Sequence, residues 1–393
     1  MLYYYLPTNN NYIDPSVFFF KDESKEPIVS HTLHEYVLKY KKQIDLHQHA
    51  WDNMKRITNP YEFIHSHVYG GPSAVAKLKP LSRSFFKMIE LCNDFELYDN
   101  NNNTINTFHL AEGPGGFIEA ISHMRNNISD TYYGMSLIDE NPNVPGWKKS
   151  ATFLKNNTNV VIESGPSGTG DLFLVENLLY CNNKHRNNMD LITADGGFDF
   201  SENFNEQEST ATKLLIAEVL FALTMQKPGG SFILKVFDLM TKSSIDILYL
   251  LSCFYKEVIV CKPLTSRIAN SEKYIVCKGF FMPKNYSGFM KYIFENYQSI
   301  MAMENISTMF NFDHNMIFIN KIEDINAIFG QQQVENISTT LGLIINHNKY
   351  DRIEQLKKNH LNKCIEWCVK YNIPHDGVVE NENIFLQKRQ TFK

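Results

Sequence analysis

Two charged residues stand beside or within runs that are expected to be buried strands. Lys235 lies inside the apolar run 232–237, and Asp195 directly follows the apolar run that ends at Ala194. A charged lysine inside an apolar strand is costly unless it is paired or functional. The alternative is a lysine at the end of the strand whose amine reaches water. The sequence alone leaves both interpretations of Lys235 open.

A glycine-rich segment, 113–117 (Gly-Pro-Gly-Gly-Phe), lies between an expected strand and an expected helix. At the carboxyl end of a strand in an open α/β sheet, glycines let a ligand approach the backbone, and the next helix offers free N–H groups. A plain tight turn explains the segment equally well. Its spacing is not that of the GxGxxG dinucleotide fingerprint.

A second glycine-rich segment, 165–170, has the two end glycines of a phosphate-binding P-loop. Asp171 and Leu172 occupy the positions where lysine and serine or threonine should follow. A phosphate loop without its lysine is a poor nucleoside triphosphate site, so we reject an NTPase. Asp171 is better placed to accept hydrogen bonds from a neutral or cationic ligand.

Further charged residues lie near the ends of expected elements. Glu272 is expected at the start of the last strand. A run of four cations within eleven residues contains no acidic side chain and consists of Lys77, Lys79, Arg83 and Lys87. A solvated charged face is the usual explanation of such a run, but it is also a candidate patch for nucleic acid.

The composition bounds the class of protein. The chain has 393 residues, is 43% hydrophobic and carries a net charge of −5, which excludes a polycation that binds nucleic acid by bulk charge. No apolar run reaches the ~18–20 residues of a membrane span, and the N-terminus does not resemble a secretory signal. The seven cysteines form no CxxC pair. We therefore expect a reduced, intracellular protein.

Alternating patterns predict the fold class: an α/β Rossmann-like methyltransferase sheet of seven strands flanked by helices. The expected strands are 105–111, 132–137, 158–162, 189–194, 230–237, 256–262 and 273–281. Helices are expected at 116–125, 171–181, 208–226 and 243–254. Strands that alternate with helices indicate a mainly parallel sheet. The last two strands have a short connection and are expected to form an antiparallel hairpin.

This alternation divides the chain into three parts. Residues 78–284 form the expected methyltransferase domain, between an N-terminal extension at 1–77 and a C-terminal extension at 285–393. Both extensions are expected to be mostly helical, with one helix beginning near Ser30 and another at about 350–371.

Four residues of the expected domain resemble a known set. Lys87, Asp195, Lys235 and Glu272 resemble the Lys-Asp-Lys-Glu tetrad of FtsJ-like (RrmJ-type) RNA 2′-O-ribose methyltransferases. The detail is closest to the eukaryotic and viral mRNA cap branch. The segments that carry this detail are 56–62, 113–117, 170–172, 194–198, 235–238, 262–267 and 270–274. Each motif is weak alone, but their order is specific, and the resemblance covers roughly residues 52–283.

The resemblance implies an enzyme that moves a methyl group from S-adenosylmethionine to a ribose 2′-hydroxyl near the 5′ cap of mRNA. The first transcribed nucleotide is the expected target. All four tetrad residues are implied to be catalytic, with Lys235 as the general base. Desolvation, the positive Lys87 and the sulfonium would favour the neutral amine that a base requires. No metal is expected to be needed.

The resemblance also implies two groups of binding residues. Those expected to bind the cofactor are Ser82, Gly113, Pro114, Gly115, Gly116, Phe117, Asp171 and Asp195. Those expected to contact RNA are Lys55, Arg56, Arg83, Asn205, Glu206 and Asn270. Capped mRNA is the expected partner, together with other capping or transcription proteins, and no membrane.

Two alternatives remain open. The same chemistry could act on rRNA or tRNA, although the segment 59–62 and the long C-terminal region favour the cap branch. A catalytically idle RNA-binding subunit of a capping complex is the second, but an idle copy has no physical reason to keep a buried lysine. A cellular enzyme of this kind is expected in the nucleus, and one from a large cytoplasmic DNA virus in the cytoplasm or virion.

Overall fold

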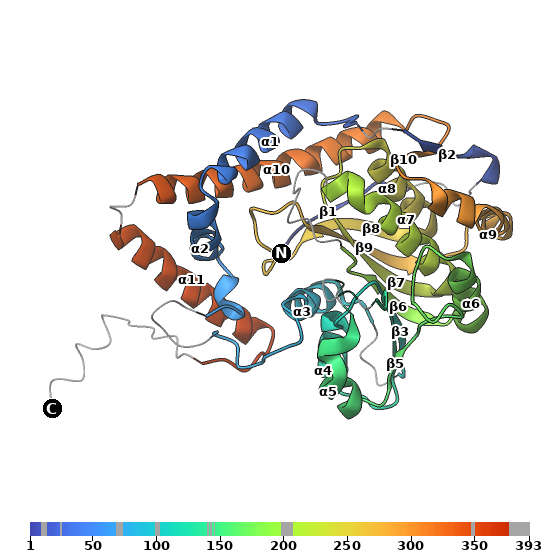
Figure 1. The fold of residues 1–393 in the computed structure, drawn as a ribbon, viewed down its shortest axis with the longest axis horizontal. Helices are drawn as coiled ribbons and strands as arrows, with labels where there is room; N and C mark the ends of the chain where they lie inside the picture. Colours follow the sequence, from blue (N-terminus) through green and yellow to red (C-terminus); the bar gives the residue numbers. More distant parts are fainter. Residues whose placement is uncertain are drawn as a thin grey trace.

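The computed structural model describes residues 1–8, 14–23, 26–67, 74–98, 103–139, 141, 144, 146–197, 207–346 and 350–376. Within these residues, eight strands form one sheet in the order β1-β8-β9-β7-β6-β3-β4-β5 (Figure 1). The strands are β1 (Leu2–Tyr5), β3 (Asn106–Leu110), β4 (Thr131–Met135), β5 (Val160–Ile162), β6 (Met189–Ala194), β7 (Gln226–Val236), β8 (Tyr255–Lys262) and β9 (Lys273–Phe280). A second, two-stranded sheet pairs β2 (Phe18–Asp22) with β10 (Ile306–Phe310).

Helices connect most of these strands. They are α1 (His31–Asp45), α2 (Gln48–Thr58), α3 (Ser84–Phe95), α4 (Gly116–Arg125), α5 (Ala151–Asn156), α6 (Val175–His185), α7 (Gln207–Met225), α8 (Lys242–Phe254), α9 (Tyr286–Ala302), α10 (Met316–Ile345) and α11 (Tyr350–Lys370), with short 3-10 helices η1 (Pro15–Val17), η2 (Glu62–Ile64) and η3 (Trp147–Ser150). Within the described part of the chain, no helix combines the length and apolarity that a membrane span needs.

The main sheet is parallel from β5 through β4, β3 and β6 to β7. Strand β9 runs antiparallel to both of its neighbours, β7 and β8. This confirms the mainly parallel sheet with a final antiparallel hairpin. A doubly wound sheet of this kind gathers the carboxyl ends of its parallel strands at one edge, where ligands bind.

The prediction of seven strands is wrong, because β1 adds an eighth at the edge of the sheet. It pairs antiparallel with β8, with Leu2 opposite Lys262 and Tyr5 opposite Ile259. This strand has only four residues, and Tyr3 and Tyr5 are exposed. So short a strand, paired with residues more than 250 positions away, leaves little local pattern to recognise.

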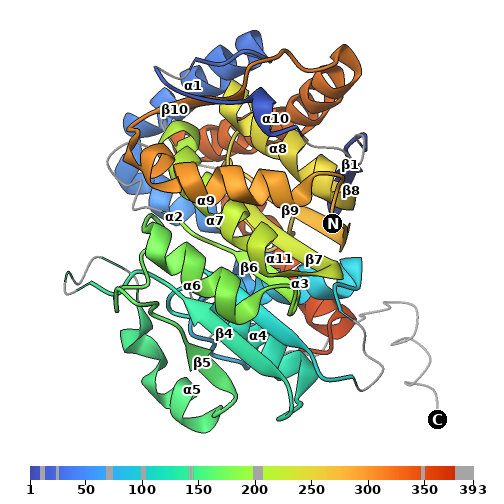
Figure 2. The ribbon, with the colours of Figure 1, turned by 90° about the vertical axis from the view of Figure 1, so that its right-hand side faces the viewer.

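Helices cover both faces of the sheet (Figure 2). Successive residues of β7 point to opposite faces, so Phe232 and Leu234 join the hydrophobic cluster that includes α7, α8 and α9, whereas Ile233 joins the cluster that includes α3, α4 and α11. Lys235 follows Leu234 in the same strand and therefore lies on the α3 face. The strand's period thus brings Lys235 toward the helix that carries Lys87.

The segments on both sides of residues 78–284 pack against the sheet and against each other. The expected helices near Ser30 and at 350–371 correspond to α1 and α11. Helix α10, which was not identified from the sequence, lies along α1 and also contacts α2 (Figure 1). The expected domain boundaries at 77/78 and 284/285 stay predictions.

Candidate active site

Lys235 and Asp195 lie side by side at the carboxyl ends of two adjacent parallel strands. Lys235 is the second-last residue of β7, and Asp195 directly follows β6. The Lys235 amine donates a hydrogen bond of 2.7 Å to the Asp195 main-chain oxygen and lies 3.4 Å from Asp195 Oδ1. The side chains keep 13% and 12% of their surface exposed, so both remain within reach of a ligand.

Lys87 and Glu272 form the second half of the tetrad. Lys87 comes from the first turn of α3, and Glu272 directly precedes β9, whose start lies at the same edge because β9 is antiparallel to β7. Lys87 Nζ and Glu272 Oε1 are 2.7 Å apart in a buried ion pair. The Ser266 hydroxyl donates a 2.7 Å hydrogen bond to the same carboxylate oxygen.

Tyr274 joins the two halves. Its hydroxyl donates to Asp195 Oδ1 at 2.8 Å and accepts from Lys87 Nζ at 3.3 Å. The side chain is fully buried, and burial raises the pKa of Tyr274 well above its usual value, so the hydroxyl keeps its proton. Sequence reasoning assigned Tyr274 no role, although a residue two positions after Glu272 in an extended segment points to the same side.

Burial and neighbouring charges set the ionisation of the Lys87–Glu272 pair. Burial lowers the pKa of Lys87, which Glu272 partly opposes. Burial would raise the pKa of Glu272, but Lys87, Arg83 and Lys235 outweigh that effect and hold it well below its usual range. Glu272 is therefore ionised, and its charge keeps the buried Lys87 amine in place.

The glycine turn at 113–117 links β3 to α4, as expected. Gly115 has a φ of +99°, a conformation that favours glycine, and it precedes the first residue of α4. A Cβ on Gly116 would lie 2.2 Å from Ser82 Oγ, so the predicted cofactor residue Ser82 does lie against the turn. Trp147 packs on the other side, 3.2 Å from the position of a Cβ on Gly115. The missing Cβ atoms of these two glycines therefore leave room for the side chains of Ser82 and Trp147 beside the turn.

The segment that precedes Asp171 lies at the same edge of the sheet, where it contacts Ser136. Sequence reasoning did not identify Ser136. The Gly113 N–H donates to Ser136 Oγ at 3.3 Å, and a Cβ on Gly170 would lie 2.4 Å from the Ser136 main-chain oxygen. Asp171 Oδ1 accepts a 2.8 Å hydrogen bond from Phe173 N, which fixes the carboxylate. The two glycine-rich segments therefore meet over the end of β4.

The predicted RNA contacts fall into three groups. Arg83 precedes α3 and acts electrostatically on both Lys87 and Glu272, and Asn270 lies in the loop before β9. Lys55 and Arg56 lie on α2, outside the main sheet, where Lys55 forms an ion pair with Asp52. Asn205 and Glu206 lie outside the described residues.

Two further carboxyls are buried behind the site. Glu112 accepts a hydrogen bond from the Phe117 N–H at the start of α4, and burial raises its pKa well above the usual value. Glu218 on α7 lies against Gly196, where a Cβ would come within 2.2 Å of Glu218 Oε1. Burial raises the pKa of Glu218 to about 8, against the opposing effect of Lys235. Glu218 was not identified from the sequence, because its burial depends on helix packing.

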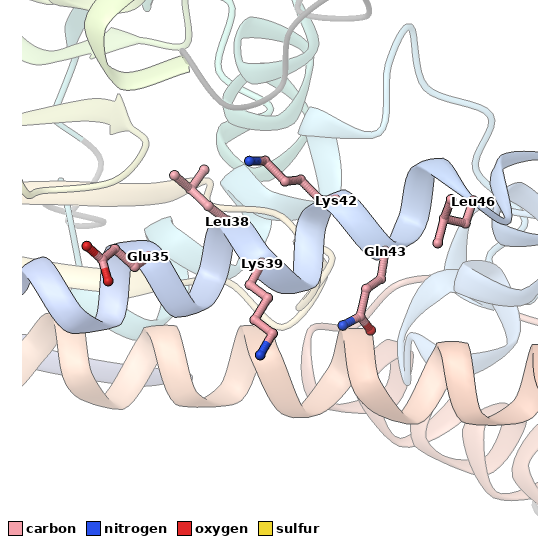
Figure 3. A pocket seen from close by; sticks show the side chains of 6 residues that line it. All are labelled: Glu35, Leu38, Lys39, Lys42, Gln43 and Leu46. Atoms are coloured by element: carbon pink, nitrogen blue, oxygen red, sulfur yellow. The ribbon is translucent and has the colours of Figure 1, made fainter.

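A separate hollow of about 510 Å³ runs along α1 (Figure 3). Lys39 and Gln43 point toward α10, while Leu38 and Lys42 point away from it. Its lining contains none of the tetrad residues. Among the residues that the structure describes, no group of three or more His, Cys, Asp or Glu side chains could hold a metal ion.

The strand order, the turn after β3 and the charged network at the strand ends define a Rossmann-like methyltransferase domain. The FtsJ-like methyltransferase family matches residues 80–280, more than half of the chain, and the chain belongs to this family. The family resemblance of the sequence is thereby confirmed.

Curated relatives are named cap-specific mRNA (nucleoside-2′-O-)-methyltransferases. Methyltransferase 2 of Danio rerio is 29% identical over 339 residues, which cover 79% of this chain and 42% of that protein. Human methyltransferase 1 is 36% identical over 179 residues, 43% of this chain and 21% of that protein. The chain thus spans less than half the length of these relatives. Among solved structures, human methyltransferase-like protein 13 in complex with SAH is 11% identical, covers 56% of this chain and 90% of its own, and has a TM-score of 0.34.

Proposed function

We propose that this chain transfers a methyl group from S-adenosylmethionine to a ribose 2′-hydroxyl near the 5′ cap of mRNA, at the first transcribed nucleotide. The observation that carries the proposal is the continuous network Glu272–Lys87–Tyr274–Asp195–Lys235 at the ligand-binding edge of the sheet. The names of the curated relatives support the cap as the substrate class.

Lys235 is the proposed general base. A ribose hydroxyl is a weak nucleophile and must lose its proton as it attacks, so a base must lie within hydrogen-bond reach. Asp195 orients the Lys235 amine through its main-chain oxygen and Oδ1, at 2.7 and 3.4 Å. The Lys235 side chain keeps 13% of its surface exposed, and its neutral amine would accept the proton that passes from the ribose hydroxyl oxygen to Lys235 Nζ.

The other residues of the network position this amine. Glu272 keeps Lys87 in place through their 2.7 Å ion pair. Tyr274 holds the Asp195 carboxylate through a 2.8 Å hydrogen bond. Near in-line alignment supplies much of the rate in a methyl transfer, so this rigidity serves the reaction directly.

The residues at the strand ends fit S-adenosylmethionine, which supplies the methyl group when bound. The turn 113–117 and Ser82 would hold its amino-acid end and ribose, and Asp171 would lie near its adenine. Leu137 and Ile138, at the end of β4, keep 40% and 45% of their surface exposed beside the Asp171 loop. An exposed apolar surface next to a fixed carboxylate suits an adenine ring.

The test is methyl transfer from labelled S-adenosylmethionine to short RNAs, capped and uncapped, by the wild type and Lys235→Met. Nucleoside mass spectrometry would locate the label, and RNAs already 2′-O-methylated at the first or second nucleotide would identify the target position. We expect label on capped RNA at the first nucleotide, lost in Lys235→Met.

Each other outcome contradicts a specific part of the proposal. Equal labelling of uncapped RNA would favour a structural RNA as substrate. Label at the second nucleotide would contradict the target position alone. RNA binding without transfer by the wild type would favour an idle RNA-binding subunit. Further protein partners and the cellular location stay predictions.

A further inference from the structure

We infer that Glu62 and Arg267, an ion pair in which the Glu62 carboxylate is buried, are positioning residues that fix the 263–272 loop and thereby present Ser266 and Glu272 to Lys87. The inference rests on the proposed methyl transfer and adds the segment 59–66 to the machinery of that site. Glu62 and Arg267 both lie in segments with family resemblance, but no role follows from the sequence for either.

The ion pair is two-pronged, with Glu62 fully buried and the Arg267 side chain 26% exposed. Arg267 Nε lies 2.9 Å from Glu62 Oε2, and Arg267 Nη2 lies 2.5 Å from Glu62 Oε1. The Asn59 amide and the Ser66 hydroxyl each donate a further 3.0 Å hydrogen bond to the same carboxylate. Burial would raise the pKa of Glu62, but Arg267 more than reverses this and lowers it to about 2. The pair is therefore charged at any working pH.

Two further groups hold the loop on either side of this pair. At its beginning, Glu90 on α3 accepts hydrogen bonds of 2.7 and 2.8 Å from the N–H groups of Leu264 and Thr265. At its end, Lys262 donates to the main-chain oxygens of Asn270 and Glu272, at 2.8 and 2.7 Å. Arg267 lies between these anchors, so its ion pair fixes the middle of the loop.

The position of Arg267 connects the pair to the tetrad. Its neighbour Ser266 donates the 2.7 Å hydrogen bond to Glu272 Oε1, the oxygen that also pairs with Lys87. A shift of Arg267 would move Ser266 and hence the Glu272 carboxylate. Since a displacement of about 1 Å can cost a hundredfold in rate, loss of the pair is expected to slow methyl transfer.

A second two-pronged arginine–carboxylate pair provides a control. Arg125 Nε and Nη2 lie 2.8 and 3.0 Å from Asp130, whose carboxylate also accepts from the Ile105 N–H and the Tyr132 hydroxyl. Ile105 and Asp130 precede β3 and β4, at the edge of the sheet opposite the tetrad. Breaking this pair also removes a two-pronged arginine–carboxylate interaction, but one that lies outside the 263–272 loop.

The experiment compares Glu62→Gln, Arg267→Gln, their double variant and the control Asp130→Asn. We would measure the thermal midpoint, cofactor affinity by calorimetry, kcat and KM for capped RNA, and hydrogen exchange of residues 263–272. We expect each single variant to lower kcat about tenfold or more, and the double variant to fall no further, because both changes break one interaction. Cofactor affinity should change less than about threefold, while Asp130→Asn lowers the midpoint and leaves kcat within about twofold.

Three results would overturn the inference. The first is a double variant whose loss of kcat equals the product of the two single losses, and the second is a fall of kcat in Asp130→Asn in proportion to the fall of its thermal midpoint. The third is unchanged hydrogen exchange of residues 263–272. If Glu62→Gln does not fold, Arg267→Lys keeps the charge but not the two-pronged geometry, and it should still lower kcat and speed exchange in the loop. An inactive wild type would contradict the proposed function, whereas the exchange measurement would still decide the role of the pair.

Discussion

The Tyr274 hydroxyl donates a 2.8 Å hydrogen bond to Asp195 Oδ1, across two strands that are not neighbours in the sheet. Strand β7, which carries Lys235, lies between β6 and β9. The hydrogen bond therefore spans the strand of the proposed base and keeps the Asp195 carboxylate beside it. The same hydroxyl accepts from Lys87, so one phenol connects both halves of the tetrad.

Replacement of Tyr274 by phenylalanine tests this connection. We expect Tyr274→Phe to lower kcat about tenfold, because Asp195 and Lys87 lose a shared partner, and to cost about 1 kcal/mol of unfolding free energy. Steady-state kinetics and urea unfolding are the measurements. Tyr255→Phe is the control, since Tyr255 is equally buried and donates to Gln226, at a distance of 3.1 Å. A kcat loss in Tyr255→Phe as large as that in Tyr274→Phe would contradict the specific role of Tyr274.

Because Glu218 is buried, we expect the free energy of unfolding to depend on pH. Its pKa is raised from 4.5 to about 8, so the folded state binds the proton more tightly than the unfolded state. The stabilisation is complete below the unfolded pKa and is lost as the pH rises toward the folded pKa. Relative to Glu218→Gln, the wild type should lose up to about 1.4 kcal/mol per pH unit between about pH 5 and 8, then level off. Urea unfolding at several pH values measures this difference, with the exposed substitution Glu354→Gln as control. A difference that does not change with pH would show that Glu218 is ionised in the folded state.

The surroundings of Gly116 leave no room for a side chain in the turn 113–117. A Cβ there would lie 2.2 and 2.3 Å from the hydroxyl oxygens of Ser82 and Ser84, so the turn must shift in Gly116→Ala. We expect a loss of about 1–3 kcal/mol in unfolding free energy, as for other overpacked sites, and weaker binding of S-adenosylmethionine in calorimetry. In Gly342→Ala on α10, the added Cβ meets no atom within 4 Å, so stability should stay equal or rise. Unchanged cofactor affinity in Gly116→Ala would exclude the turn from the cofactor site.

We expect Arg83 to contribute electrostatically to the binding of capped RNA. It lies close enough to the tetrad to influence Lys87 and Glu272, at the start of α3. If its guanidinium contacts a phosphate, Arg83→Gln should weaken binding of capped RNA and reduce the slope of log affinity against log salt by about one. Fluorescence anisotropy at several salt concentrations measures the slope. Lys39→Gln, in the hollow on α1, should leave it unchanged. A slope that Arg83→Gln does not alter would exclude this phosphate contact.

The central sheet was predictable because its elements follow local patterns. Apolar runs of strand length alternate with helical patterns between β3 and β9, and the order of such units restricts the possible topologies. The edge strand β1 was not predictable in this way, since its partner β8 lies more than 250 residues along the chain. Helix α10 was not identified from the sequence, although it buries Phe318, Ile322, Ile325 and Phe329 at helical spacing.

The sequence by itself determined which chemical groups lie at the ligand-binding edge. Lys235 and Asp195 are placed there by the ends of two strands, and Glu272 by the start of another, and strand ends can be recognised from local apolar patterns. The tertiary structure decided how these groups connect. The Lys87–Tyr274 contact joins residues 187 positions apart, and the Glu62–Arg267 pair joins residues 205 positions apart. Such contacts depend on strand register and on the packing of α3 and η2, which no local pattern specifies.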